Sequence, residues 1–400
     1  MPPSTSALTW TRRLLLAVVC GVSVANVYYA QPLLERVGAE MSISTAQLGW
    51  VVAVGQAGYL VGPAALVPLG DWLNRRSLIP AHLLVIAVGA TAVAVSPGPA
   101  VLYAGVALAG AFSVVVQIAV AYTAAQSPPD ERGRNLGIVT SGVVVGIIMA
   151  RTVAGAVGGL AGWRAVYACA AAVAVGMAVL TWVALPDDRP LPAPASYGRV
   201  VAATLVLGAD DRVFRVRALI AFFLFASFGV LWSGLALPLS DAPWRLSPEQ
   251  IGLFGFAGLA GALGAARAGR WADRGRADLV TVVALVVLIV SWSPIGYAAH
   301  SLWLVALGAV LLDFAVQAVH VTNQGLIVAR DPDASSRTIG GYMISYSLGS
   351  ALGAVTTSTL YALGGWPAAS ISGACYAAAA LAVWLVDRVV PDRSTATPVG

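Results

Sequence analysis

Two charged side chains, Arg151 and Asp313, fall deep inside long apolar stretches of the sequence. A charge within the hydrocarbon of a membrane costs about 2.5 to 3.5 kcal/mol on insertion scales, so such residues usually face a cavity or a partner and mark a pathway. We expect both to line a central cavity, where Asp313 exchanges protons and Arg151 either acts as its electrostatic counterpart or holds an anionic part of a substrate. The alternative is that each only ties neighbouring helices together through hydrogen bonds.

A stripe of polar residues includes Asp313. Gln317, His320 and Gln324 follow it at positions i+4, i+7 and i+11, and Asn323 stands beside them. This spacing places the side chains on one face of a helix. It predicts a wet cavity wall in which His320 is a second proton candidate. A seam of interhelical hydrogen bonds, each contributing about 0.6 kcal/mol, is the alternative.

Further polar and aromatic residues inside apolar stretches are candidates for the same wall. They are Asn26, Tyr29, Gln117, Tyr342 and Tyr346. An aromatic and amide wall suits a substrate that is partly apolar and carries a few polar groups. Each of these residues could equally serve packing alone.

The composition indicates that these residues lie in a membrane. Of the 400 residues 59% are hydrophobic and 10% are charged, and the mean hydropathy is +0.83, whereas soluble domains carry roughly 25% charged residues. Long apolar runs without period-two alternation favour helices over a β-barrel. We expect twelve spans of about 20 residues, near residues 14–36, 46–69, 78–96, 100–125, 136–160, 164–185, 218–240, 250–268, 279–298, 302–328, 339–363 and 367–387.

A stretch with many proline, aspartate and arginine residues, 186–217, interrupts the apolar pattern near its midpoint. It predicts a cytoplasmic linker between two bundles at 14–185 and 218–388, with cytoplasmic tails at 1–13 and 389–400. The expected fold class is an all-α integral membrane protein with twelve transmembrane helices in two pseudo-symmetric six-helix bundles.

All 23 basic residues are arginines. They lie in short loops and not on one polar face, so we expect no nucleic-acid partner. With a cytoplasmic N-terminus, the loops expected on the outside contain only Arg36, Arg164 and Arg245. The positive-inside rule therefore predicts a multi-pass protein of the cell inner (plasma) membrane with both termini in the cytoplasm.

The two halves are related by sequence. An offset of 203 residues takes Pro129 to Pro332, Arg134 to Arg337, Gly162 to Gly365 and Trp163 to Trp366. This pattern indicates a duplication, and two six-helix repeats with a binding site between them are an arrangement that gives alternating access. At the same offset Arg151 corresponds to Ala354, and Asp313 corresponds to Gly110. Both buried charges are therefore places where the halves differ.

The loop GDWLNRR at 70–76 has an echo in GRWADRGR at 269–276. We expect these loops to form a cytoplasmic latch that holds the halves together when the cavity opens outward, because an aspartate near helix ends can pair with arginine and with a helix N-terminus. The alternative is a solvated loop whose arginines only set the orientation. The residues of this predicted latch are Gly70, Asp71, Arg75, Arg76, Asp273 and Arg274.

On these two loops the chain resembles the major facilitator superfamily. The segments NVYYAQPLL (26–34), ARTVAGAVGGLAGWR (150–164) and DFAVQAVHVTNQ (313–324) are similar to spans of its bacterial drug/proton antiporter-like branch. The resemblance implies the twelve-helix fold and proton-driven transport. The fifth span lacks the Gly-Pro pair expected for that branch, and the fourth lacks the arginine that many proton-coupled members carry.

The leading functional hypothesis is secondary active transport of a small organic molecule by alternating access, as proton-coupled efflux. Uptake or facilitated diffusion of a metabolite or organic anion is one alternative, and a non-transporting membrane sensor is another. We expect no enzymatic activity, cofactor or metal ion, because the histidines are dispersed and no phosphate-binding glycine loop occurs. Protons and the lipid bilayer are the other expected partners, and we expect a monomer.

Overall fold

The computed structural model describes residues 8–66, 69–70, 73–128, 131–188, 211–328 and 335–389, and in these residues it is helical without a strand. The first half contains α1 (Trp10–Tyr28), η1 (Gln31–Leu33), α2 (Leu34–Met41), η2 (Thr45–Gln47), α3 (Leu48–Ala65), α4 (Arg75–Ala94), α5 (Pro99–Phe112), α6 (Val115–Ala125), α7 (Arg132–Ala161) and α8 (Trp163–Ala184). The second half contains α10 (Arg212–Gly234), α11 (Ala236–Ser240), α12 (Pro248–Gly252), α13 (Phe254–Trp271), η4 (Ala272–Arg276), α14 (Ala277–Gly296), α15 (Leu302–Val328) and α16 (Ser335–Val389).

These elements make twelve membrane crossings, as the sequence predicts. Within the described residues, nine helical stretches are long and apolar enough to span a membrane. The stretch that contains α16 holds two crossings, because Gly364 and Gly365 leave helical geometry inside it. Helices α3 and α13 supply the remaining two. The fold class is therefore confirmed.

The helices begin and end where local chemistry requires it. Thr9, Asn74 and Asp211 cap α1, α4 and α10 by accepting backbone N–H groups, which satisfies donors that would otherwise lack a partner. Helix α10 begins at Arg212, so residues 212–217 of the expected linker are helical. Gly162 separates α7 from α8 with φ of 84°, and Gly365 divides α16 with φ of 66°. Glycine tolerates these angles, and the two breaks stand 203 residues apart.

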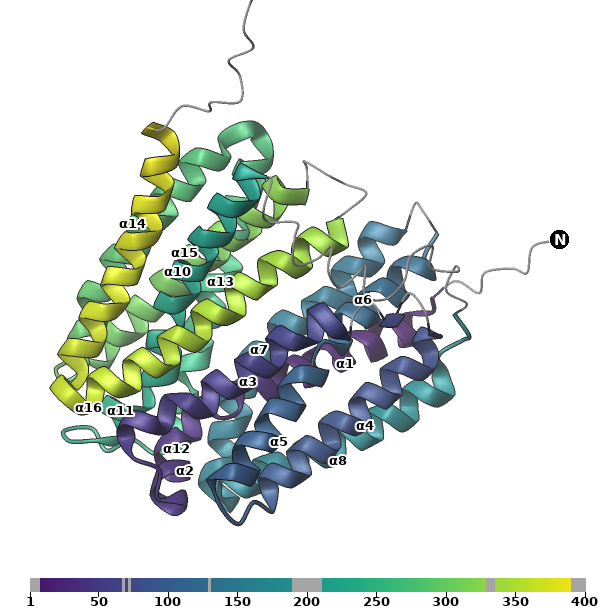
Figure 1. Cartoon of the computed structure of the whole chain (residues 1–400), viewed down its shortest axis with the longest axis horizontal. Coiled ribbons are helices and arrows are strands. Elements are labelled where there is room, and N and C mark those ends of the chain that lie inside the picture. Colours follow the sequence, from purple (N-terminus) through teal and green to yellow (C-terminus); the bar gives the residue numbers. More distant parts are fainter. Residues whose placement is uncertain are drawn as a thin grey trace, which may run out of the picture.

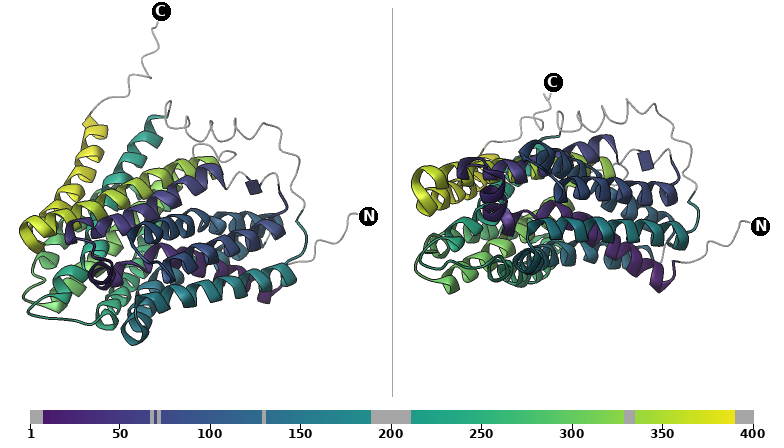
Figure 2. Two further views of the ribbon diagram at one scale, coloured as in Figure 1. Left: turned by 60° about the horizontal axis from the view of Figure 1, so that its bottom comes forward. Right: turned by 90° about the horizontal axis from the view of Figure 1, so that it is seen from below.

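The two halves form separate bundles that lie side by side (Figures 1 and 2). Corresponding helices pack in the same register. Gly58 of α3 lies against the backbone carbonyl of Ala107, and Gly261 of α13 lies against that of Val310. Both members of the second pair follow those of the first by 203 residues, so the duplication extends to the helix contacts.

The halves meet closely at one end of the molecule, near the labels α2, α11 and α12 in Figure 1. We call it the closed end. Two seams seal it. In one, α3 packs on α16 and Ser358 Oγ donates to the carbonyl of Ala46 at 3.1 Å. In the other, α12 packs on α7 and Thr152 Oγ1 donates to the carbonyl of Gly252 at 3.2 Å.

Candidate functional site

Arg151 lies at the interface between the halves. Its side chain projects from α7 and is 4% exposed. Nε donates to Oε1 of Gln31 at 2.9 Å. Three aromatic rings surround the guanidinium carbon, with centroids at 3.8 Å for Trp232, 5.1 Å for Tyr28 and 5.7 Å for Phe228. Cation–π contacts of this kind contribute about 2 kcal/mol when desolvated, so the cage compensates part of the cost of burying the charge.

Asp313 lies at the N–H edge of the Trp232 indole, whose face contacts Arg151. The carboxylate is 5% exposed, and its Oδ2 accepts the indole N–H of Trp232 at 3.1 Å. Within the described residues Arg151 and Asp313 make no direct ion pair. The two charges instead contact the same ring: the Trp232 face contacts the cation, and its N–H contacts the anion.

Two glycines of α13 make room for this carboxylate. A methyl group at Gly258 would lie 3.0 Å from Asp313 Oδ2 and 3.0 Å from the Trp232 ring, and one at Gly261 would lie 3.0 Å from the Asp313 Cβ. A larger side chain at Gly258 would displace Asp313 or Trp232, and one at Gly261 would also push away the α15 backbone at Val310. The glycine pair on α13 therefore fixes the position of the acid.

Two tyrosines join the halves beside Arg151. The hydroxyl groups of Tyr28 and Tyr346 are hydrogen-bonded to each other. The Tyr346 ring packs on Phe225, with centroids 4.1 Å apart. His320 Nδ1 pairs with the Tyr342 hydroxyl at 3.1 Å. Of the residues expected to line the wall, Tyr346, Tyr342 and His320 thus form one continuous polar and aromatic cluster next to Arg151 and Tyr28.

The other polar residues of the predicted stripe on α15 differ in burial and in hydrogen-bond partners. Gln317 and Gln324 are half-buried. Asn323 Oδ1 accepts from Arg217 Nη1 at 3.3 Å, and its Nδ2 donates to the Arg217 carbonyl at 3.4 Å. Asn323 therefore takes part in an interhelical hydrogen-bond seam. Arg217, which we assigned to a cytoplasmic loop, is itself buried and lies within α10.

Three other candidate residues have partners away from Arg151. Asn26 Nδ2 donates to the Val22 carbonyl of its own helix at 2.9 Å. Gln117 Nε2 donates to the Tyr59 hydroxyl at 3.0 Å. Tyr29 packs edge-on against Tyr167 of α8, with ring centroids 6.2 Å apart. Their role in a substrate path stays a prediction.

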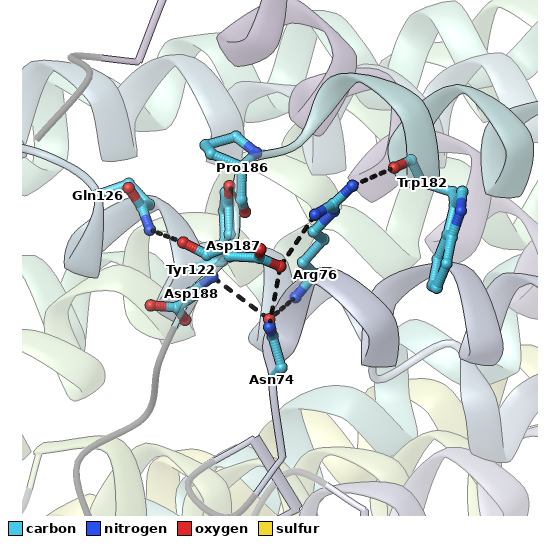
Figure 3. A network of polar contacts seen from close by, with 8 residues as sticks. All are labelled: Asn74, Arg76, Tyr122, Gln126, Trp182, Pro186, Asp187 and Asp188. Atoms are coloured by element: carbon cyan, nitrogen blue, oxygen red, sulfur yellow. Dashed lines mark hydrogen bonds and ion pairs between the residues drawn. The ribbon is translucent and has the colours of Figure 1, made fainter.

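The described part of the predicted latch loop contacts the residues that follow α8 (Figure 3). Arg76 Nη1 pairs with Asp187 Oδ1 at 2.9 Å, Arg75 Nη1 pairs with Asp188 Oδ2 at 2.9 Å, and Asn74 Nδ2 donates to Asp187 Oδ1 at 3.2 Å. These contacts hold the start of α4 to the residues that follow α8.

The remaining latch residues leave the hypothesis open. Asp71 and the Asp273 side chain lie outside what the structure describes, Gly70 precedes this gap, and Arg274 is exposed in η4. A latch between the halves therefore stays a prediction.

The sequence did not predict four residues of the site to line a cavity: Tyr28, Gln31, Phe228 and Trp232. Trp232 carries a usable signal, because it falls in the middle of an apolar span while Trp163, Trp244, Trp303 and Trp366 fall near predicted span ends. A buried indole N–H needs an acceptor, and Asp313 provides it. Phe228 gives no such signal.

Known proteins resemble the chain along nearly its whole length. The profile of the Major Facilitator Superfamily matches residues 14–241 and 217–400. The "Uncharacterized transporter YgaY" of Escherichia coli O157:H7 is 39% identical over 370 residues, which cover 92% of this chain and 94% of that protein. The "Probable transporter SCO4007" of Streptomyces coelicolor is 31% identical over 384 residues, covering 95% and 87%.

A solved structure shares the fold. The inward-facing, occupied form of a bacterial homolog to the human lysosomal transporter Spinster superposes with a TM-score of 0.78 at 15% identity, covering 94% of this chain and 96% of that one. That identity supports the fold alone. Together with the profile and the two relatives, these findings show that the chain is a multi-pass membrane transporter and belongs to the Major Facilitator Superfamily.

Proposed function

We propose that this transporter couples the movement of a small organic molecule to protons, and that Asp313 is the group that binds the proton. The observation that carries the proposal is the position of Asp313: a buried carboxylate with one hydrogen bond, from Trp232, and a cation of the other half on the face of the same ring. Burial of a charge without an opposite charge in direct contact is costly, and binding a proton removes that cost.

Few other groups can compete with Asp313 for this role. Among the described residues, the charged or titratable groups that interact with it are Arg151 from α7 and Tyr28 from α1. Helices α10 and α13 contribute Trp232 and two glycines, and α14 carries no titratable residue between positions 279 and 296. His320 lies two turns further along α15.

The proton can bias alternating access because the two charges belong to different halves. Charged Asp313 attracts Arg151 and so favours the arrangement in which the closed end is sealed. Protonation removes the attraction and favours separation of the halves there. Opposite charges one aromatic ring apart attract by about 2 kcal/mol in a protein, which corresponds to about thirtyfold in the populations of two states.

The arginine distribution supports an orientation for this cycle. Arg75, Arg76, Arg212 and Arg388 lie at the end opposite the seams, and the positive-inside rule assigns that end to the cytoplasm. On this proposal the described arrangement faces inward, both termini are cytoplasmic, and the protein acts in the plasma membrane as a monomer.

The direction of substrate movement then depends on the substrate's charge. Proton-coupled efflux requires a substrate that competes with the proton at Asp313, as a cation does. A substrate that promotes protonation of Asp313 moves in the same direction as the proton, which corresponds to proton-coupled uptake. Efflux is the hypothesis favoured by the resemblance to antiporters, whereas the Arg151 cage favours the second case.

Transport by Asp313→Asn tests the proposal. A compound whose cellular level depends on the chain is first identified by comparing metabolites of cells with and without it. In proteoliposomes, an imposed pH gradient should then drive accumulation of this compound by the wild type and by Asp241→Asn, which alters a carboxylate at the closed end that is bonded to Tyr361. Asp313→Asn should equilibrate the compound without accumulating it. Unchanged accumulation by Asp313→Asn would remove the residue from the proton path.

A further inference from the structure

Within the part of the chain that the structure describes, one nitrogen of the Arg151 guanidinium lacks a hydrogen-bond acceptor. Its Nη2 is buried and has no hydrogen-bond partner, while Nε is bonded to Gln31. The three rings of the cage offer their faces to the positive charge, but none accepts this N–H. Leaving a buried donor of a charged group unpaired costs the full desolvation penalty of that group. A residue kept in this condition is prepared for a partner from outside the protein.

A small pocket adjoins the Arg151 side chain. Arg151, Gln31 and Trp232 form its polar lining, and Pro32, Leu235, Ala236 and Ile251 form the rest. The enclosed space has room for about one water molecule. No carboxylate lines it. The pocket is therefore electropositive and shaped for one oxygen atom or one small ion.

We propose that this pocket binds an anionic group. Two sources share that chemistry: one carboxylate oxygen of an organic anion, which would make the transported molecule an organic acid, and an inorganic ion such as chloride. The assignment of the substrate class rests on the proposed transport function, whereas the anion site does not. Planar guanidinium groups suit carboxylates because they present parallel N–H donors.

Gln31 sets how a carboxylate would enter. Its amide oxygen occupies Arg151 Nε, so an anion can join at Nη2 without breaking that bond, or it can replace Gln31 and engage two donors at once. Gln31 is the first residue of η1, the short helix that follows α1 at the closed end, where the seams open in alternating access. An anion at Arg151 therefore lies where it can contact both halves.

An anion in this pocket gives proton coupling a definite sign. The pocket is lined by Arg151 and by Trp232, which also contacts Asp313, and two negative groups near one arginine repel each other. Anion binding thus favours protonation of Asp313, and protonation of Asp313 strengthens anion binding, because linkage between two ligands is reciprocal. The anion and the proton bind together and cross the membrane in the same direction.

Melting of the full-length protein in detergent tests the anion site. Purified wild type is held in gluconate buffer and titrated with chloride, acetate, benzoate or succinate, with benzamide as a neutral match for benzoate. We expect at least one of these anions to raise the melting temperature with saturation, and benzamide to leave it unchanged. Arg151→Gln should bind that anion about 10- to 100-fold more weakly, since bonds to charged groups contribute about 1.5 to 3 kcal/mol.

Arg217→Gln is the matched control. Arg217 is also a buried arginine, but it is bonded to Thr281, Asn323 and Asp278. Its loss can lower the melting temperature, yet the shift caused by the anion should persist. Arg151→Lys, which keeps the charge and loses the planar fork, should bind a carboxylate less tightly than the wild type and chloride nearly as well.

The different anions distinguish an organic acid from an inorganic ion, and the variants distinguish the anion site from the proposed proton coupling. A shift with carboxylates identifies an organic acid, and a shift with chloride alone identifies an inorganic ion. Equal shifts in wild type and Arg151→Gln, or none with any anion, would overturn the anion site. In proteoliposomes that contain a pH indicator, inward movement of the binding carboxylate should acidify the lumen. Alkalinisation of the lumen would contradict the predicted movement of anion and proton in the same direction, but Asp313 would remain the proton site. If the anion site is overturned while coupling still depends on Asp313, the proposed function stands without it.

Discussion

The same helix crossing occurs in both halves with different chemistry. In the first half Gly110 of α5 packs directly on the backbone of Gly55 in α3. In the second half Asp313 of α15 stands over Gly258 in α13 and reaches Trp232. Each residue of the second crossing follows its counterpart by 203 positions. The duplicated scaffold therefore tolerates a charge where neighbouring helices leave space for it and supply a hydrogen-bond donor, and it excludes a charge where the helix backbones touch.

The two seams at the closed end differ in the same way, and here the charge is Arg151. Gly49 packs over the carbonyl of Ala354, and Gly252 packs over the carbonyl of Arg151. The backbone contact is thus shared, while only the second seam carries a side chain that reaches the centre of the molecule. Both charges consequently face the same indole from two different helices, and the site is asymmetric on a symmetric frame.

The largest expected effect comes from placing the acid in the wrong half. Gly110→Asp puts a carboxylate into the Gly55 backbone, where it finds neither space nor an indole donor. Overpacking and an unpaired buried charge together should destabilise the protein by about 3 to 5 kcal/mol, read as a lower melting temperature and as aggregation in size-exclusion chromatography. Gly98→Asp, at a position with no atom near the added side chain, should melt as the wild type does. Equal melting temperatures of Gly110→Asp and Gly98→Asp would contradict the difference between the two helix crossings.

A smaller effect is expected at the seams. A methyl group at Gly49 would overlap the Ala354 carbonyl, whereas one at Gly252 would lie 2.8 Å from the Arg151 carbonyl. Gly49→Ala should therefore shift the population toward the state that is open at this end more strongly than Gly252→Ala. Reaction of a cysteine introduced at Ala46 or Ser358 with a water-soluble maleimide should rise in the same order. The reverse order would show that the seams are not equivalent.

The smallest expected effect concerns the indole itself. Trp232→Phe keeps an aromatic face for Arg151 and removes the N–H that Asp313 accepts. Loss of one hydrogen bond to a charged group should cost about 1.5 to 3 kcal/mol when Asp313 is charged and less when it is neutral. Transport by this variant should thus reach its maximum at a higher pH than transport by the wild type. An unchanged pH profile would separate Trp232 from the proton site.

The sequence predicts the frame of this protein better than its centre. Apolar windows and the 203-residue offset predict the twelve crossings and the matching glycine breaks, because both are local or repeated patterns. The ring that contacts both Arg151 and Asp313 could not be predicted, since its position depends on how α10 is rotated relative to α7 and α15. Arg217 was misplaced for a related reason: a positive charge at the edge of an apolar run is typical of a loop, but Asn323, Thr281 and Asp278 give it a buried site.

The central claim is that the charge of Asp313 holds the closed end together. Spin labels at Gln47 and Leu363, which are exposed and lie in opposite halves near the seam of α3 and α16, report the opening of that end once Cys20, Cys169 and Cys375 are replaced by serine. We predict a short distance at high pH, a growing long-distance population as the pH falls, and in Asp313→Asn a raised long-distance population that does not change with pH. A pH response in Asp313→Asn equal to that of the wild type would contradict the claim.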